Sequence, residues 1–133
     1  MSAGDLPPVR HELENLLYRY AELADERDAE GLGRLLADAT LEFPGAGAVR
    51  GAGPISEHYR GIFDGTPPSR HVVTNVIVSA DGADTASTRC RYARWLLGAS
   101  AQLVALGEYE STFHRGDGQW RFHRHVVTRS WSA

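Results

Sequence analysis

The chain has 133 residues, 42% of them apolar, which predicts one folded domain with its own core and excludes an intrinsically disordered chain. Its formal net charge of −3 and pI of about 6.0 give no reason to expect a nucleic acid or an anionic membrane as partner. The sequence contains arginine but no lysine, so a mechanism through a lysine Schiff base is excluded.

Three helices are predicted in the first half of the chain. Apolar residues recur at steps of three and four from Val9 onward, which is typical of an amphipathic helix, and the pattern ends near Asp25. Asp28 is typical of an N-cap and begins a second, shorter helix through Leu36. The segment "LEFPGAG" predicts a short strand, and the glycine-rich "GAGAVRGAGP" predicts a turn. The third helix is predicted by "GPISEHYRGIFDG", in which a glycine ends the helix.

The second half of the chain changes to a period of two and predicts four long strands. These strands are "RHVVTNVIVSA", "TASTRCRYARWLLG", "AQLVALGEYESTFHR" and "QWRFHRHVVTRSW", with turn signals at "DGAD" and "GDG". Gly107 interrupts the third strand and indicates a bend or the close approach of another group. We therefore expect a single α+β domain over residues 1–133, in which three N-terminal helices pack on a curved mixed or antiparallel sheet and enclose a pocket.

The sequence argues against several kinds of site. Cys90 is the single cysteine, so an internal disulfide and a multi-thiolate metal site are excluded. No dinucleotide-binding glycine motif, P-loop or nucleophile elbow is present, and we expect no cofactor and no metal. His123 and His125 are two residues apart, which on a strand places both imidazoles on one face, near His114. No carboxylate stands at a spacing that would complete a metal site, so an exposed sheet edge is favoured over a metal site.

The expected location of the protein is the cytoplasm. The N-terminal residues show no basic start followed by an apolar run, so a signal peptide is not expected. The longest apolar runs are far below the ~20 residues that a membrane span needs.

The chain resembles the NTF2-like α+β cone and, within it, the SnoaL-like group. The resemblance is carried by "LLYRYAELADERDAEGL", "RHVVTN" and "GEYESTFHRGDGQWRFHR", together with the order of helices and strands, and it covers the chain from about residue 9 onward. This group includes polyketide cyclases, scytalone dehydratase-type dehydratases and lindane dehydrochlorinase-type lyases. The resemblance implies the cone fold, but a shared fold hosts many reactions.

In the dehydratase and dehydrochlorinase members, an aspartate after the first helix and a histidine that opens the first long strand form a proton-transfer pair. The resemblance assigns these positions to Asp25 in "LADERD" and His71 in "RHVVTN". Two positions depart from the family pattern. The helical position at which the dehydrochlorinase carries a lysine is Tyr20 here, and a second pocket histidine of the dehydratases falls near Cys90. The acid–base pair is therefore carried over, while the groups that polarise the substrate are not.

The residues themselves leave alternatives to this pair open. Strand alternation places His71 on one face with Asn75, but both faces of this strand are half apolar, so His71 is also consistent with a structural histidine. On a helical wheel of ~100° per residue, Asp25 lies roughly 120° from Leu13, at the edge of the apolar face. Asp28 lies closer, at roughly 60°, but has a competing role as a cap. Both carboxylates could instead be solvated.

Arg124 is a further candidate, because it shares a predicted strand face with apolar residues such as Phe122. A cation in such a position is costly unless it is paired. It either binds an anionic group of a ligand or forms an internal ion pair. The candidate internal partners are Glu108, Glu110 and Asp25.

Tyrosines could donate hydrogen bonds to a ligand, and the candidates are Tyr20, Tyr59, Tyr92 and Tyr109. Tyr109 follows Gly107 by two residues and is expected to face inward. Asn75 and Cys90 are expected to line the pocket without a chemical role.

We expect a cofactor-independent lyase, isomerase or cyclase that acts on a small, apolar, cyclic or aromatic molecule. His71 moves the proton, Asp25 orients His71, and Tyr20, Tyr109 or Arg124 supports the developing negative charge. The alternative is a non-catalytic binding protein or a small subunit like that of ring-hydroxylating dioxygenases. A homodimer or homotrimer that associates through the outer sheet face is also expected.

Overall fold

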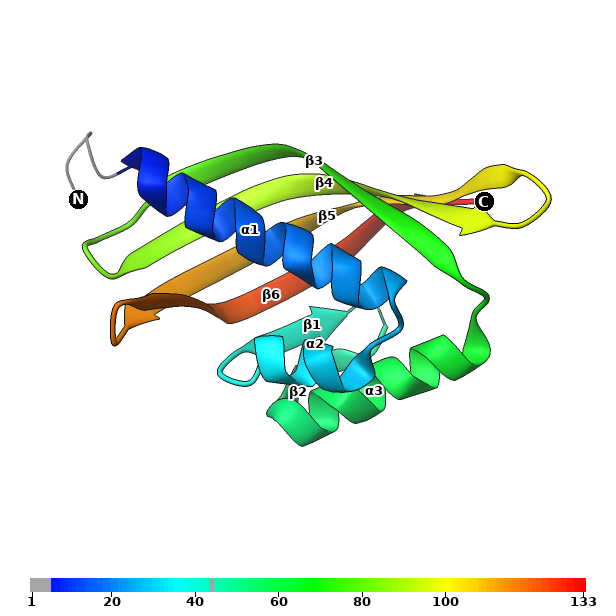
Figure 1. Cartoon of the computed structure of the whole chain (residues 1–133), viewed down its shortest axis with the longest axis horizontal. Helices are drawn as coiled ribbons and strands as arrows, with labels where there is room; N and C mark the ends of the chain where they lie inside the picture. Colours follow the sequence, from blue (N-terminus) through cyan, green and yellow to red (C-terminus); the bar gives the residue numbers. More distant parts are fainter. Residues whose placement is uncertain (1–5, 44) are drawn as a thin grey trace.

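Three helices pack against one face of a six-stranded mixed sheet, and the helix α1 lies across this face (Figure 1). The computed structural model describes residues 6–43 and 45–133. The predicted α+β architecture is confirmed, with the helices first along the chain and the four long strands after them.

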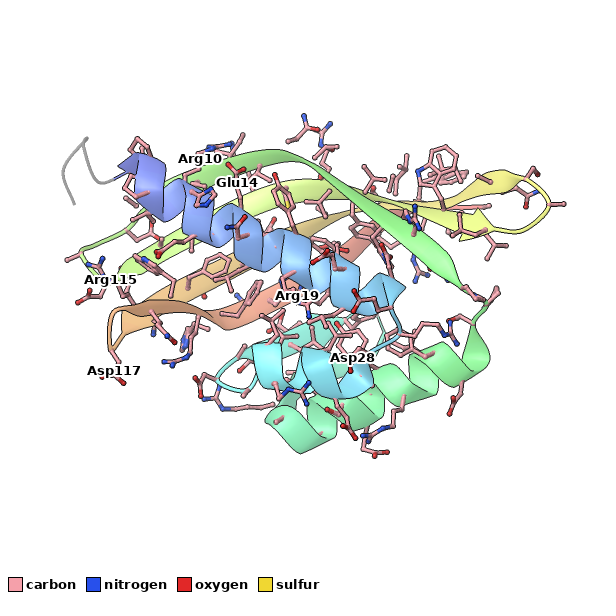
Figure 2. The ribbon with its side chains drawn as sticks, viewed as in Figure 1. Arg10, Glu14, Arg19, Asp28, Arg115 and Asp117 are labelled. Carbon is pink, nitrogen blue, oxygen red and sulfur yellow. The ribbon has the colours of Figure 1, made fainter. Side chains whose placement is uncertain are left out.

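The helices begin and end close to the predicted positions. α1 spans Leu6–Asp25 and buries a stripe that includes Leu13, Leu17 and Tyr20. α2 spans Ala29–Leu35, and its N-cap is Asp28, whose Oδ1 accepts a hydrogen bond of 2.9 Å from the backbone N–H of Gly31. Figure 2 shows Asp28 at the start of α2. α3 spans Ala52–Gly65 and packs on α2.

The strands form one sheet in the order β2-β1-β6-β5-β4-β3. The strands are β1 (Thr40–Phe43), β2 (Gly47–Arg50), β3 (Ser69–Ala80), β4 (Thr85–Leu97), β5 (Ala101–Gly116) and β6 (Gln119–Ser132). The last four strands form an antiparallel meander, as expected, and β1 joins β6 in parallel. The sheet is therefore mixed, with β1 and β2 at the edge beside α2 and α3 (Figure 1).

The interpretation of "GAGAVRGAGP" as a turn is wrong in part, because four of its residues form β2 and pair antiparallel with β1. Gly45 and Gly47 have positive φ angles of 76° and 71°, which allows the chain to reverse between the two strands. The short second strand has no apolar alternation that would have indicated it.

The register shifts at four places among the long strands, and bulges at two of these places change the faces expected for candidate site residues. Asn75 has a φ of 57° at a shift in register between Thr74 and Ile77, so the residues after it exchange faces. In β6, Thr112 pairs with Arg124 and Phe113 pairs with Phe122, which leaves His123 as the extra residue. Both bulges decide which side chains reach the covered face of the sheet.

The core lies between the covered face of the sheet and the helices, and its largest fully buried side chains include Leu17, Tyr109, Phe113 and Phe122. In the part of the chain that the structure describes, no helix has the length and apolar character of a membrane span. On the opposite face of the sheet Val72, Ile77 and Leu106 are exposed, which is the face where self-association is expected. The oligomeric state stays a prediction.

Candidate active site

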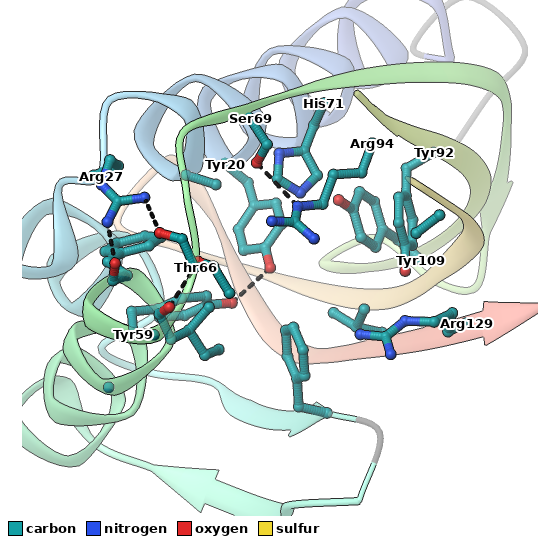
Figure 3. Close-up of a pocket in the computed structure, with 18 residues that line it drawn as sticks. Tyr20, Arg27, Tyr59, Thr66, Ser69, His71, Tyr92, Arg94, Tyr109 and Arg129 are labelled. Carbon is teal, nitrogen blue, oxygen red and sulfur yellow. Dashed lines mark hydrogen bonds between the residues drawn. The ribbon is translucent and has the colours of Figure 1, made fainter. Parts of the chain in front are cut away.

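A cavity of about 300 Å³, partly open to solvent, lies between the end of α1, α3 and the covered face of the sheet. Figure 3 shows its lining, in which aromatic side chains alternate with cations and hydroxyl groups. Its polar lining comes from Tyr20, Arg27, Tyr59, Thr66, Ser69, His71, Tyr92, Arg94, Tyr109 and Arg129. This volume is at the lower end of the range for small-molecule sites.

Asp25 and His71 meet at the wall of this cavity. Asp25 Oδ1 accepts two hydrogen bonds of 2.8 Å, one from the backbone N–H of His71 and one from its Nδ1. The side chains of His71 and Asp25 are 17% and 22% exposed, so the pair is shielded without being sealed from solvent. The predicted meeting of a helix carboxylate and a strand imidazole is present.

The end of α1 explains how Asp25 reaches His71 from the edge of the apolar face. Asp25 is the last residue of α1, and the chain turns away through Arg27, which has a positive φ of 59°. The carboxylate is therefore free to extend toward the start of β3. Asp28 is used as the N-cap of α2, which removes it as the competing partner.

The hydrogen bonds decide which nitrogen of His71 can act as a base. An ionised carboxylate only accepts hydrogen bonds, so Nδ1 of His71 carries its proton when it faces Asp25. The remaining nitrogen, Nε2, then holds a lone pair. Because His71 lines the cavity, this arrangement presents a basic nitrogen to a bound molecule.

Four tyrosines form the aromatic wall of the cavity. The hydroxyl groups of Tyr20 and Tyr59 lie 2.5 Å apart, and the ring of Tyr20 packs edge-on against Tyr109. Burial raises the pKa of Tyr20, Tyr59 and Tyr109, so all three phenols stay protonated and can donate hydrogen bonds. Since only one proton is shared between Tyr20 and Tyr59, the other hydroxyl proton of this pair can be donated to a ligand.

Gly107 allows two of these rings to stack. A Cβ at Gly107 would collide with the ring of Tyr92 and with the backbone oxygen of Thr128. Without it, Tyr92 lies nearly parallel to Tyr109, with ring centroids 4.7 Å apart and an angle of 15° between the planes. The close approach expected from the sequence at Gly107 is thus confirmed.

Three arginines that line the cavity were not among the predicted site residues. Arg27 donates from its guanidinium to the carbonyl oxygens of Thr66, at 3.0 Å, and of Phe63, which ties the end of α1 to the end of α3. The Nε of Arg94 donates to Ser69 Oγ at 2.9 Å. Arg129 lies on β6, directly before a shift in register that leaves Ser130 as an extra residue. No short motif marks these positions, because the bulges and the ends of elements determine where they point.

Arg124 lies outside the cavity, contrary to its expected place on an apolar face. The bulge at His123 turns Arg124 to the outer face of the sheet, where its guanidinium binds both carboxylate oxygens of Glu42, at 2.9 and 2.8 Å from Nη2. The internal ion pair among the two alternatives is present, but its partner is Glu42 and not one of the three carboxylates considered.

Asn75 and Cys90 do not line the cavity either. The bulge at Asn75 places this residue in a separate surface depression with Arg89 and Glu108. Cys90 is 3% exposed and belongs to the apolar core, and burial raises the pKa of its thiol to about 12. A reactive thiolate is therefore not available at this position.

The three histidines near the last hairpin do not share one face. His114 and His123 stack with ring centroids 3.9 Å apart, whereas His125 is fully buried and shares a hydrogen bond of 2.8 Å between its Nδ1 and Ser111 Oγ. Burial lowers the pKa of His125 to about 3, so this imidazole is neutral. Residues 6–43 and 45–133 contain no group of three or more histidine, cysteine, aspartate or glutamate side chains placed to hold a metal ion.

Comparison with known proteins identifies the family. The family model of the SnoaL-like domain matches residues 8–126. A search of curated proteins gave no match.

Several solved structures share the fold at low sequence identity. A hexachlorocyclohexane dehydrochlorinase from Novosphingobium barchaimii has a TM-score of 0.86 at 19% identity, over 99% of this chain and 93% of that chain. A protein of unknown function from Mycobacterium tuberculosis has a TM-score of 0.83 at 24% identity, over 98% and 77% of the two chains. A protein proposed to be a scytalone dehydratase, from Novosphingobium aromaticivorans, has a TM-score of 0.79 at 20% identity, over 100% and 91%. An NTF2-like protein from Novosphingobium aromaticivorans has a TM-score of 0.79 at 24% identity, over 98% of this chain and 89% of that chain, which establishes the NTF2-like fold.

Proposed function

Because the chain belongs to the SnoaL-like domain family and holds an aspartate–histidine pair at the wall of its cavity, we propose that it is a cofactor-independent enzyme. Its substrate is a small, largely apolar molecule that is cyclic or aromatic. The reaction is the elimination of a leaving group, an isomerisation or a cyclisation. The observation that carries this proposal is the 2.8 Å contact between Asp25 Oδ1 and His71 Nδ1 beside an accessible cavity.

The proposed step begins with His71. Its Nε2 takes a proton from a carbon next to a leaving group or a carbonyl, and the electron pair of that C–H bond forms a double bond as the leaving group departs or the carbonyl oxygen becomes negative. Asp25 holds the imidazole in place and stabilises the imidazolium that forms. In an isomerisation or a cyclisation, the same nitrogen returns the proton.

The developing negative charge is proposed to be stabilised by phenols. Tyr20 and Tyr109 line the cavity beside His71, and burial keeps both protonated because it raises their pKa. Preorganised donors in a site that excludes water stabilise such charge more strongly than water does. Arg124 has no part in this step, because it is bound to Glu42 outside the cavity.

The names of two relatives are consistent with this class of reaction. One similar structure is a dehydrochlorinase and another is proposed to be a scytalone dehydratase. A non-catalytic binding protein, or a subunit without chemistry of its own, would need neither the pair nor its access to the cavity. The position of His71 on the cavity wall therefore favours the enzyme over these alternatives.

The test uses a panel of chlorinated cyclohexanes, cyclic β-hydroxy ketones and cyclic ketones, incubated with the protein in deuterium oxide. Loss of chloride or water, or uptake of deuterium at the acidic carbon, is followed by NMR. The wild-type chain is expected to act on at least one class, and His71→Gln is expected to lose about 10³-fold in rate. His11→Gln, on the exposed side of α1, serves as the matched control. Equal rates in the wild type and in His71→Gln would contradict the proposal.

A further inference from the structure

We propose that the ligand of the cavity carries a carboxylate group, and that Arg94 and Arg129 bind it. This inference rests on the proposed function only in taking the cavity as the substrate site. It names the class of molecule, a cyclic or aromatic carboxylate, which neither the family nor the acid–base pair specifies.

The first observation is the charge of the lining. The cavity is lined by three arginines, and among the described residues no carboxylate lines it. Asp25 lies nearest, but its Oδ1 already accepts from the backbone and from the ring of His71. The described part of the chain contains no ion pair between a carboxylate and any of Arg27, Arg94 or Arg129.

The second observation separates the three arginines by their hydrogen bonds. Arg27 has a structural use, because its two terminal nitrogens donate to backbone carbonyls of α3 and the segment that follows it. Arg94 uses only Nε, toward Ser69 Oγ, which orients the guanidinium and leaves both of its terminal nitrogens for a ligand. Arg129 lies beside Tyr92, whose phenol pKa is raised by burial against the opposing effect of this arginine.

The third observation is the arrangement of the strands. Arg94 lies on β4 and Arg129 on β6, so β5 runs between them. Across the sheet their backbones are roughly two strand spacings, or about 10 Å, apart, and they are also offset along the strands. The residues of β5 between them are Ala105 and Gly107, which pair with Arg94 and Arg129 respectively. Ala105 is small and lines the cavity beside Arg94, whereas the ring of Tyr92 lies over Gly107.

The direction of Arg94 links the anion site to the base. Figure 3 shows the guanidinium of Arg94 beneath the ring of His71 and directed toward the hydroxyl of Tyr20. A planar guanidinium matches a carboxylate through two parallel hydrogen bonds. A carboxylate held there leaves the ring of the ligand against the aromatic wall, within reach of His71.

The positive charges of the lining agree with this assignment. Burial and the positive charges of Arg129 and Arg27 lower the pKa of Arg94. Like charges that line one cavity repel one another, and a bound anion reduces this repulsion. The cavity therefore stabilises an anionic ligand more than a neutral one of the same shape.

The experiment compares a naphthoate with its uncharged amide, naphthamide, by isothermal titration calorimetry in a buffer of low chloride concentration. The wild type is expected to bind naphthoate at least about tenfold more tightly than naphthamide, because only the carboxylate can form a charge-assisted bidentate contact with a guanidinium. Arg94→Gln and Arg129→Gln are each expected to weaken naphthoate binding by about tenfold and to leave naphthamide binding unchanged. Arg121→Gln is the matched control, because Arg121 lies outside the cavity near Asp38.

The outcomes separate this inference from the proposed catalysis. His71→Gln should keep the preference for naphthoate while it loses turnover, so a failure of the His71 rate test leaves the carboxylate site standing. Equal or tighter binding of naphthamide by the wild type would overturn the carboxylate site, whatever the rate test gives. Unchanged naphthoate affinity in both arginine variants, with melting curves that show them folded, would overturn it as well.

Discussion

Arginines on the outside of the molecule and arginines in the cavity differ in their partners. On the outside, Arg10 pairs with Glu14 at 2.5 Å, side by side on α1 in Figure 2, and Arg124 binds both oxygens of Glu42. In the cavity, Arg94 and Arg129 have no carboxylate partner among the residues that the structure describes. Exposed ion pairs contribute little to stability, so their loss is tolerated. Arg94 is half-buried and Arg129 is exposed, and both line the cavity without a carboxylate partner within the described ranges. This difference supports the proposed anion site.

Replacement of Asp25, beside the cavity, should give the largest effect on turnover. Asp25→Asn removes the carboxylate that fixes Nδ1 of His71 as the donor, so we expect turnover to fall by about 10³ to 10⁴. The rate constant kcat, measured on whichever panel compound reacts, checks this result. Glu42→Gln, which removes the partner of Arg124 on the outer face, should leave kcat unchanged. A comparable loss in both variants would remove the distinction between the two regions.

Gly107 tests whether the inner face depends on close packing. The Cβ of Gly107→Ala would meet the ring of Tyr92 and the Thr128 backbone, so the stack with Tyr109 must shift and we expect the free energy of unfolding to fall by about 3 kcal/mol. Gly116→Ala, at a position with nothing within 4 Å of the added Cβ, should change it by less than about 0.5 kcal/mol. Urea denaturation measures both, and similar values would contradict the account of Gly107.

The buried His125 predicts a dependence of stability on pH. Burial lowers its pKa from 6.5 to about 3 in the folded chain, so between these values the unfolded state binds more protons than the folded state. The contribution of neutral His125 to the free energy of unfolding is complete above pH 6.5. It is lost as the pH falls toward 3, at roughly 1.4 kcal/mol per pH unit. When denaturation is measured between about pH 4.5 and 6.5, a window between these two pKa values, the free energy of unfolding should change less steeply with pH for His125→Asn than for the wild type.

His11→Asn, on the exposed side of α1, is the control for this slope. It should keep the slope of the wild type. An identical slope in His125→Asn and the wild type would show that His125 is not kept neutral by burial.

The outer ion pair should give the smallest effect. Arg124→Gln breaks an ion pair whose side chains are 53% and 35% exposed, so we expect a loss of at most about 1 kcal/mol in the free energy of unfolding. Naphthoate affinity should not change, because Arg124 does not line the cavity. A large loss of affinity in this variant would show that the outer and inner arginines are not independent.

The sequence predicted the elements well because their signals are local. The apolar steps of α1, the cap at Asp28 and the period of two in β3 to β6 each depend on residues close together in the chain. The contact of Asp25 and His71 joins positions 46 residues apart, and it was predicted only through the family resemblance. The helical wheel alone placed Asp25 at the edge of the apolar face.

The misplaced positions of Asn75 and Arg124 have a common physical cause in the bulges. One extra residue at Asn75 and one at His123 reversed the faces expected for the residues that follow, which moved Asn75 and Arg124 away from the cavity. The same bulge in β6 separated His123 from His125. Arg94 and Arg129 come together only across three strands of the folded sheet, so no spacing in the sequence could have grouped them.

Nitrogen NMR of isotope-labelled histidine can show whether Asp25 holds His71 with its basic nitrogen toward the cavity. We expect neutral His71 to carry its proton on Nδ1 and a lone pair on Nε2, and Asp25→Asn to remove this preference. A proton on Nε2 in the wild type, unchanged in Asp25→Asn, would contradict it.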